Sequence, residues 1–527
     1  MRIAREVRRG WVAGAVALAL GLVRVMAAAG SPLEYLPVRD PVESELRTLD
    51  LLGPEPGQPA LRLPHLGMRP LLRLEADSLP FPDRAADVAH RIALARIWRV
   101  LARDGEPGGP DGVVGRTPRI YQRRYSEAER FEVSVGLEGE ADVVAERLRP
   151  RSDTGVHARI ALETDRWLAF SHLIVGHEDS ARTFADPTFR GTEIITHTAE
   201  TYFAYSAASR HWGVQFGRSR WHWGPGEEGS LLLSETAVPI TGLAFHARLE
   251  PLHADGTALS ATLATAAGEQ LAAHRLEWQP GDGLRIGLSE AARYRSPSWQ
   301  PLYVLGAIPY ILVQRLQDQD EPAAQATHRN NIMVGADAAW RVAPGLRVYT
   351  EWLADDLHFG HGAAGPNRYA YQLGAEGART VRGTRLVWGA EWTRVNRFVY
   401  TSSYGRDFVA QGLPLGFPFA PDARRIRVRT AWDLSADWQL TGVFARTDKG
   451  ENTLGQPYRP VDPPVDASQL QGVVEATQDL EAGARWWPAG GVDLAAVMTC
   501  RWTENVGHLP GVHARDLGAR LIFRLVR

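Results

Sequence analysis

The sequence predicts an all-β transmembrane barrel preceded by a small helical segment. Three observations support this fold class. The N-terminus reads as an export signal, no later apolar run is long enough for a membrane-spanning helix, and short alternating segments fill the rest of the chain. Only helices and closed barrels span a bilayer, because every backbone polar group must be paired inside it. The pattern therefore favours a barrel over the competing interpretation, a soluble all-β periplasmic protein.

The first 29 residues have the composition of a signal peptide. Arg2, Arg5, Arg8 and Arg9 precede an uncharged apolar run over 11–23, and three alanines at 27–29 supply a cleavage site. The apolar run is shorter than the roughly 20 residues that a spanning helix needs. We therefore expect a cleaved N-terminal signal peptide and, with a barrel following it, integration into the outer membrane of a Gram-negative cell.

Composition argues against several classes of function. The formal net charge is −2, and removal of the signal peptide, with five Arg and one Glu, leaves about −6. Nucleic-acid binding, which needs a basic surface, is therefore not expected. The single Cys500 allows no disulfide framework and no cysteine-based metal cluster. No G-x-S-x-G, H-E-x-x-H or phosphate-loop motif occurs, so we predict no catalytic residue, no metal and no cofactor.

Residues 30–125 predict a small helical bundle that plugs or caps the periplasmic end of the barrel. Asp40-Pro41 and Gly53 are the start and stop signals of a first helix. Asp83 is the expected cap of a second helix, with an apolar stripe over 88–101.

A third, short helix is expected over 70–79. A Pro- and Gly-rich segment at 105–115 then separates the helical region from the strands.

Alternation of apolar and polar residues predicts strands over 126–527. The clearest examples are 131–138, 156–163, 284–289 and 424–429. Successive strand side chains point to opposite faces, so each such segment presents one face to lipid and the other to a wet lumen. The C-terminal segment alternates in the same way, with Phe523 and Leu525 on one face, and resembles the closing strand of outer-membrane barrels.

The candidate site is the segment Arg220-Trp221-His222-Trp223-Gly224-Pro225-Gly226 with the acidic pair that follows it. Tryptophans at alternate positions predict a strand end with both rings on one face. They suit either stacking on sugar rings or a girdle at the membrane interface. The arginines suit either bidentate binding of sugar carboxylates or pairing with the two glutamates in the barrel wall. The candidate polysaccharide-binding residues are Arg218, Arg220, Trp221, Trp223, Glu227 and Glu228. We assign structural roles to Gly224, Pro225, Gly226, Asn331 and Asp337.

Three blocks of this sequence resemble the Wzi family of capsule assembly proteins. They are Tyr35-Leu36-Pro37-Val38-Arg39-Asp40-Pro41, then Trp223-Gly224-Pro225-Gly226 through Gly229-Ser230-Leu231-Leu232-Leu233-Ser234, and Asn331-Ile332-Met333-Val334-Gly335-Ala336-Asp337. The sequence departs from the family where Glu235-Thr236 replace an expected asparagine pair.

The resemblance implies about eighteen antiparallel strands and a helical bundle at the periplasmic end. It also implies a non-catalytic outer-membrane lectin that attaches capsular polysaccharide or exopolysaccharide to the cell surface. Expected partners are that polysaccharide, outer-membrane lipid and the polysaccharide export machinery. The alternative is a porin or sugar-selective channel, which shares the polar lumen but leaves it open.

Overall fold

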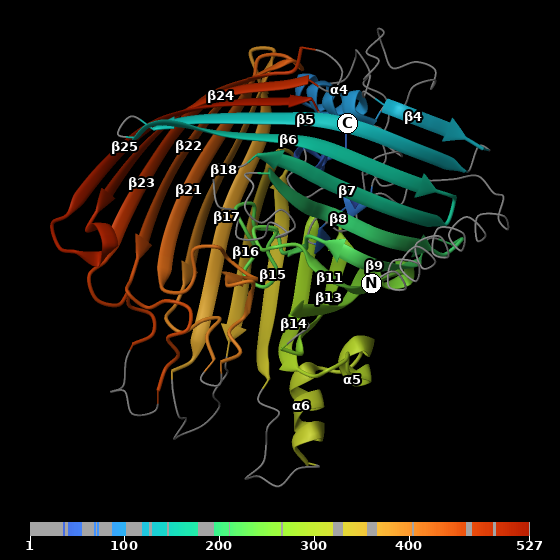
Figure 1. Ribbon diagram of the computed structural model, residues 1–527, viewed down its shortest axis with the longest axis vertical. Helices are drawn as coiled ribbons and strands as arrows, with labels where there is room; N and C mark the ends of the chain where they lie inside the picture. Colours follow the sequence, from blue (N-terminus) through green and yellow to red (C-terminus); the bar gives the residue numbers. More distant parts are fainter. Residues whose placement is uncertain are drawn as a thin grey trace, which may run out of the picture.

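The computed structural model describes residues 35–36, 41–54, 68–69, 71–72, 87–101, 119–125, 129–144, 147–177, 194–209, 211–264, 267–319, 330–355, 366–402, 405–459, 466–488 and 492–525. In this part of the chain, eighteen antiparallel strands form one closed barrel (Figure 1). The strands are β5 (Arg130–Val144), β6 (Arg147–Glu163), β7 (Trp167–His177), β8 (Ile194–Ser206), β9 (Trp212–Ser219), β11 (Ile240–Leu249), β12 (Ala254–Ala264), β13 (Glu269–Gly281), β14 (Leu284–Arg295), β15 (Asn331–Ala343), β16 (Leu346–Asp355), β17 (Arg368–Val381), β18 (Thr384–Val395), β21 (Ala423–Asp433), β22 (Trp438–Lys449), β23 (Glu475–Trp486), β24 (Val492–Glu504) and β25 (His513–Leu525). The predicted barrel is confirmed, whereas the predicted signal peptide lies outside the described residues.

The barrel closes between its first and last strands. β25 pairs antiparallel with β5, from Gly518 opposite Val144 to Leu525 opposite Leu137, which confirms the predicted closing strand. β4 (Arg119–Arg124) pairs with the first part of β5. The sheet therefore begins inside the region that the sequence assigned to the helical segment.

The two ends of the barrel differ in the length of their connections. At one end, which we call the short-turn end, tight turns join β13 to β14, β15 to β16 and β17 to β18. At the other, the long-loop end, the connections include those from β14 to β15 and from β18 to β21. In Figure 1 the short-turn end is at the top and the long-loop end at the bottom.

The strands present an apolar face outward and a more polar face inward. The outward face includes Phe216, Phe245, Leu276, Leu288, Leu373, Ile426, Phe444, Leu480, Met498 and Leu521, all of them exposed. The predicted alternating segments lie in β5, β6, β14 and β21, in agreement with the sequence analysis. Such a band is the surface that a barrel presents to lipid.

Tryptophans gather outside the barrel near its short turns. Trp212, Trp278, Trp340, Trp432, Trp438 and Trp486 lie close to the strand ends there, and all are exposed. The rings of Trp438 and Trp486 stack at 5.4 Å between centroids. Amphipathic rings at this level form the aromatic girdle of a membrane barrel.

Two helices, α2 (Pro41–Leu52) and α4 (Val88–Leu101), pack against each other at the short-turn end. α2 begins at the predicted Pro41 and ends before Gly53, whose φ of 78° is a conformation that glycine adopts readily. The first turn of α4 is capped by Asp87, whose Oδ2 accepts a hydrogen bond from Ala89 N at 3.0 Å. The expected cap, Asp83, lies outside the described residues.

The helix expected over 70–79 is wrong at its two described positions. Strand β3 (Leu71–Leu72) pairs antiparallel with β1 (Tyr35–Leu36) instead. Two more short ladders join β2 (Met68–Arg69) to β10 (His222–Trp223) and β19 (Val409–Ala410) to β20 (Leu413–Pro414). Local sequence pattern missed the first ladder because its strands lie far apart in the chain.

The remaining helices belong to connections of the barrel. α5 (Pro301–Leu305) and α6 (Tyr310–Gln319) follow β14, and single 3-10 turns occupy Glu250–Leu252 and Val506–His508. None of the described helices has the length and apolar character needed to cross a bilayer.

Candidate functional site

The predicted site segment belongs to the connection between β9 and β11, residues 220–239, which we call the lumen loop. This loop starts at the long-loop end and folds against the inward face of the wall. Glu351 of β16 accepts hydrogen bonds from Gly226 N at 2.8 Å and from Leu231 N at 2.9 Å. A Cβ on Gly224 would lie 2.2 Å from Oε1 of Glu351, and its φ is 143°. Position 224 therefore requires glycine, as expected for a structural turn.

Both tryptophans of the segment are buried in an apolar core inside the barrel. Trp221 is 6% exposed and Trp223 is 2% exposed. Their core includes Leu231, Leu232, Leu233, Val399, Tyr400, Phe408, Leu415 and Phe417. The two rings share one core, in line with the alternate spacing, but the girdle interpretation is wrong because neither ring lies on the outer surface. Burial also leaves little ring surface for a sugar.

The lumen loop contacts a second loop, residues 396–402 and 405–422, which we call the rim loop. Ser234 N donates to Leu415 O at 2.8 Å, and the Tyr400 hydroxyl donates to Leu231 O. Asp355 at the end of β16 accepts a hydrogen bond from Tyr400 N at 2.6 Å. Two loops from the same end of the barrel thus fold as one unit.

Arg220 and Arg218 have different surroundings. Arg220 Nη1 donates to the backbone oxygens of Glu235 at 3.0 Å and Ala237 at 2.7 Å, so this guanidinium fixes the end of the lumen loop. Arg218 shares a strand face with Phe216, which is exposed toward lipid. The described contacts join Arg220 to backbone oxygens, and the predicted pairing of these two arginines with Glu227 and Glu228 stays a prediction.

The two glutamates instead pair with an arginine row on the inward face of β21. Arg425 holds Glu228 through Nε and Nη2 at 2.7 and 2.6 Å. Arg429 pairs with Glu227, and Arg427 lies 3.7 Å from Glu228. Burial raises the pKa of Glu227, but Arg429 and its neighbours outweigh this effect and lower it below the ordinary value. Glu227 is therefore charged inside the lumen at neutral pH.

Helix α2 carries the second half of this charged site. Glu45 pairs with Arg385 of β18 at 2.6 and 2.8 Å, and Asp50 pairs with Arg285 of β14 and Arg347 of β16 at 2.6 Å. Burial acts to raise the pKa of both carboxylates, and the surrounding guanidinium groups lower it overall. Three wall strands, β14, β16 and β18, thus contribute arginine partners to the helix.

Arg47 connects the helix to the lumen loop. Its Nε donates to Glu376 of β17 at 2.9 Å and its Nη2 donates to Pro225 O at 2.7 Å. Pro225 is the middle residue of the predicted Gly-Pro-Gly turn, so that turn binds the helix as well as the wall. α4 adds Arg96, which lies 2.9 Å from Glu45 and 2.7 Å from Asp433 of β21.

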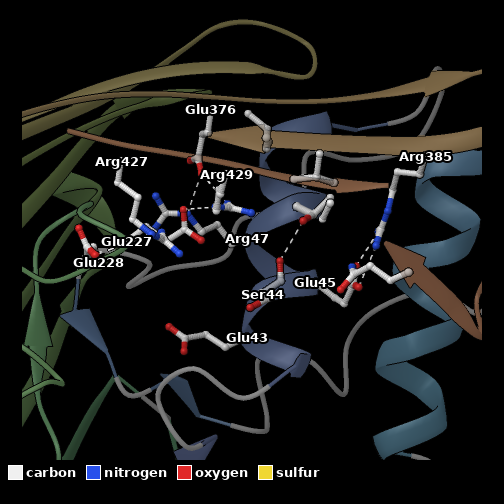
Figure 2. Close-up of a pocket in the computed structure, with 15 residues that line it drawn as sticks. Glu43, Ser44, Glu45, Arg47, Glu227, Glu228, Glu376, Arg385, Arg427 and Arg429 are labelled. Atoms are coloured by element: carbon white, nitrogen blue, oxygen red, sulfur yellow. Dashed lines mark hydrogen bonds and ion pairs between the residues drawn. The ribbon is translucent and has the colours of Figure 1, made fainter. Parts of the chain in front are cut away.

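A cavity of about 300 Å³ lies between α2, the lumen loop and strands β17, β18, β21 and β22. Figure 2 shows Glu227, Glu376, Arg429 and Arg47 grouped on one side of α2, and Arg385 with Glu45 on the other. Arg427 also lines this cavity. The arrangement is a balanced set of buried charges, which suits the fixing of α2 and the binding of polar ligands more than any bond-breaking step.

Asn331 and Asp337 make wall contacts on the inward face of β15. Asn331 Nδ2 donates to Arg406 O in the rim loop at 2.9 Å. Asp337 accepts from Arg275 Nη1 and Nη2 at 2.5 and 2.9 Å. Within the described residues, no group of three or more His, Cys, Asp or Glu side chains is arranged to hold a metal ion.

Sequence reasoning missed Glu45, Arg47 and Asp50. The sequence does carry a signal for them: α2 combines an apolar stripe with acidic and basic residues on its other faces. In the structure the side chains of Glu45, Arg47 and Asp50 are buried. A helix of this kind suits a polar lumen better than an ordinary apolar core. Predicting its partners required the barrel register, because they lie more than 200 residues away in sequence.

The fold and this site together define a class. A closed barrel with an apolar outer band, a tryptophan girdle and a charged lumen that holds a helix is an outer-membrane β-barrel protein.

Within that class, the chain belongs to the Wzi family of capsule assembly proteins, whose family model matches residues 111–515. The structure of Escherichia coli Wzi, described as an outer-membrane carbohydrate-binding β-barrel involved in group 1 capsule assembly, is similar to this chain. Its TM-score is 0.61 at 14% identity, over 94% of this chain and all of that one. Pseudomonas aeruginosa OccD3 matches less well, with a TM-score of 0.43 at 10% identity over 78% of this chain and 94% of that one. No curated protein sequence matches the chain.

Proposed function

We propose that this protein attaches capsular polysaccharide or exopolysaccharide to the outer surface of the cell, without catalysis. Membership of the Wzi family over residues 111–515 is the observation that carries this proposal. The description of the E. coli relative as a carbohydrate-binding barrel supports the ligand class. The polysaccharide export machinery is a further proposed partner, because capsule assembly requires a polymer that has already crossed the membrane.

The polarity of the barrel follows from its connections. Membrane barrels place short turns in the periplasm and long loops outside. We infer that α2 and α4 plug the periplasmic end and that the lumen loop and the rim loop enter from the cell surface. Residues 1–29 are proposed to be a signal peptide that is removed during export, and N-terminal sequencing of the purified protein tests this.

Polymer contacts are proposed at the long-loop end. Arg295 is exposed there, and Trp299 is partly exposed with its Nε1 held by Thr262 Oγ1 at 3.2 Å. A guanidinium and an indole are the groups that bind sugar carboxylates and sugar faces. Each contact is weak, but many repeats on one polymer raise the effective concentration of the next binding event.

The six residues predicted from sequence to bind polysaccharide keep that role only as a prediction. The contacts of Arg220, Trp221 and Trp223 support a role in holding the lumen loop. Glu227 and Glu228 line the cavity beside α2, where a polar group of a sugar would meet an arginine–carboxylate surface.

The channel alternative is less favoured. α2, α4 and the lumen loop occupy the lumen between wall strands that an open pore would leave solvated, and ion pairs fix them there. The similarity to the Pseudomonas aeruginosa barrel OccD3 is too weak to support a channel function for this chain.

The test is the distribution of polymer in a deletion strain complemented with the wild-type gene or with variants. The proposal predicts unchanged total polysaccharide with a shift from the cell-bound to the released fraction, reversed by the wild-type gene. The double variant Arg295→Gln/Trp299→Ala should restore attachment only in part. Arg379→Gln/Trp340→Ala, which changes exposed groups toward the other end, is the matched control and should restore it fully. An unchanged distribution, together with reduced uptake of small solutes, would favour the channel instead.

A further inference from the structure

The helix pair α5–α6 packs against the outside of the barrel, on the same side as the lipid-facing band. α5 contacts β12 and β13, and α6 contacts β14. Tyr303 and Tyr310 are buried with Tyr294 of β14, and the rings of Tyr294 and Tyr303 stack at 4.4 Å. Figure 1 shows both helices near the long-loop end, away from α4. They are therefore held by the outer wall, not by the lumen.

The wall is shaped to receive these helices. The outward residues beneath them are small, namely Ala258, Ser260, Ala272 and Ala292. The outward residues next to them in register are large and exposed, namely Phe245, Leu276 and Leu288. A Cβ on Gly306, which follows α5, would lie 2.9 Å from Cβ of Ala258, so the approach is close. Small residues allow this close packing within a membrane.

The helix pair also covers a polar site on the lipid-facing wall. Glu290 on the outer face of β14 accepts hydrogen bonds from Tyr310 N at 2.7 Å and Ile311 N at 3.2 Å. His274 lies beside it, with Nε2 3.3 Å from the carboxylate, and its ring is 4.5 Å from that of Tyr310. An acidic side chain exposed to acyl chains is costly, and the first turn of α6 removes that exposure.

The opposite face of the pair is apolar and exposed. Its large side chains are Leu302, Leu305, Ile311, Leu312 and Leu316, and Leu305 is 69% exposed. The polarity of α6 also increases along its length, from Tyr-Ile-Leu-Val at the wall to Gln-Asp-Gln at its end. A helix that passes from acyl chains to headgroups has this order of side chains.

We propose that α5 and α6 form a hairpin inserted into the outer leaflet, with lipid acyl chains covering their exposed leucines and isoleucine. The lipid is chosen as the occupant because this face continues the band formed by Phe245, Leu276 and Leu288, which already faces acyl chains. Capsule attachment does not require this role. The hairpin adds a second, lateral anchor to a barrel whose external loops bear the load of a polymer.

The experiment measures the environment of a nitroxide on the full-length protein in vesicles of phosphatidylcholine and phosphatidylglycerol. Leu312→Cys and Leu305→Cys are made separately in a Cys500→Ser background, and accessibility to oxygen and to a water-soluble nickel complex is compared. Both sites are exposed, so neither change disturbs a packed core. Ser468→Cys, in an exposed segment at the long-loop end, is the aqueous reference. The native Cys500 is the lipid reference, because it lies between the exposed, lipid-facing Leu480 and Leu517 in the β-ladder.

Lipid insertion predicts an oxygen-to-nickel ratio at both sites well above that of the aqueous reference and close to that of the lipid reference. Arg315→Cys, farther along α6, should give an intermediate ratio. Nickel accessibility equal to that of the aqueous reference overturns the proposal by placing the face in water. Low accessibility to both probes also overturns it, because a protein surface, such as a second copy of the chain, then covers the helices.

Discussion

The inner helix α2 and the outer pair α5–α6 both pack on the barrel wall, but different forces hold them. α2 is fixed by buried ion pairs such as Asp50 with Arg285 and Arg347. α5 and α6 are fixed by tyrosine rings and alanines, with Glu290 as their polar contact to the wall. The wall offers guanidinium groups on one face and small apolar side chains on the other. The comparison teaches that the same sheet binds helices by charge toward its lumen and by packing toward lipid.

The largest expected effect comes from breaking the inner contact. Asp50→Ala removes the buried carboxylate that Arg285 and Arg347 share inside the lumen, and loss of one partner of a buried pair costs about 3–5 kcal/mol. We expect a lower midpoint of guanidinium unfolding in phospholipid vesicles. Asp479→Ala is the control, since it removes a carboxylate that pairs with the exposed Arg501, and it should change stability by about 0–1 kcal/mol. Equal effects of the two substitutions would contradict the role given to burial.

The next effect concerns the turn that joins the inner helix to the lumen loop. Gly224→Ala places a methyl group against the Glu351 carboxylate and forces an unfavourable φ, so we expect the loop to be displaced. Single-channel conductance in planar bilayers should rise above that of the wild type. Gly139→Ala, which meets no atom within 4 Å, is the matched control. If conductance stays unchanged in the folded Gly224→Ala barrel, the turn does not contribute to lumen closure.

Acid should release the inner helix before the outer pair. Glu45, Asp50 and Glu227 have lowered pKa values in the folded protein, so their stabilisation is complete above the pKa of the unfolded chain and is lost as pH falls through the folded values. A nitroxide at Ser44 of α2 should stay ordered from neutral pH to about pH 5 and become mobile below about pH 4, where unperturbed carboxylates titrate. If the nitroxide at Ser44 becomes mobile between pH 7 and pH 5, groups other than these three carboxylates control the release of α2.

The smallest effect is expected outside the barrel. Tyr310→Phe keeps the ring and removes only a long hydrogen bond of 3.4 Å to Tyr303 O. The cost should stay below about 1 kcal/mol, the typical contribution of one hydrogen bond. Asp50→Asn, an equally conservative change in the inner helix, should cost more because it removes a charge that two arginines share. Protease cleavage of the connection between β14 and β15, measured for Tyr310→Phe, provides a second readout. Increased cleavage would show that the outer pair also depends on polar contacts.

The sequence predicted the elements whose signals are local. Alternation predicted strands such as β14 and β21, and it predicted that the C-terminal segment closes the barrel. The start and stop signals Asp40-Pro41 and Gly53 predicted the bounds of α2. The Trp221 and Trp223 spacing predicted a shared face, but a local pattern does not distinguish a lumen core from a lipid girdle, because both are apolar surroundings.

The partners of the charged residues were beyond local reasoning. Glu228 meets Arg425, 197 positions away, and Asp50 meets Arg285, 235 positions away. These contacts depend on strand order and register around the whole barrel. The alternation of arginines with apolar residues in β21 predicts two faces of the strand. It does not say which face points into the lumen, and only the structure places the apolar residues on the outside of the barrel.

The seam between β25 and β5 has a consequence for assembly. The charged partners of α2 lie on the arc of wall from β14 to β21, whereas the ring shuts at a different place, where the first strand of the barrel meets the last. The helix therefore need not be threaded into a finished cylinder. It can bind the strands from β14 to β21 while the sheet is still open and curved. The last strand can then pair with the first and close the barrel around the bound helix.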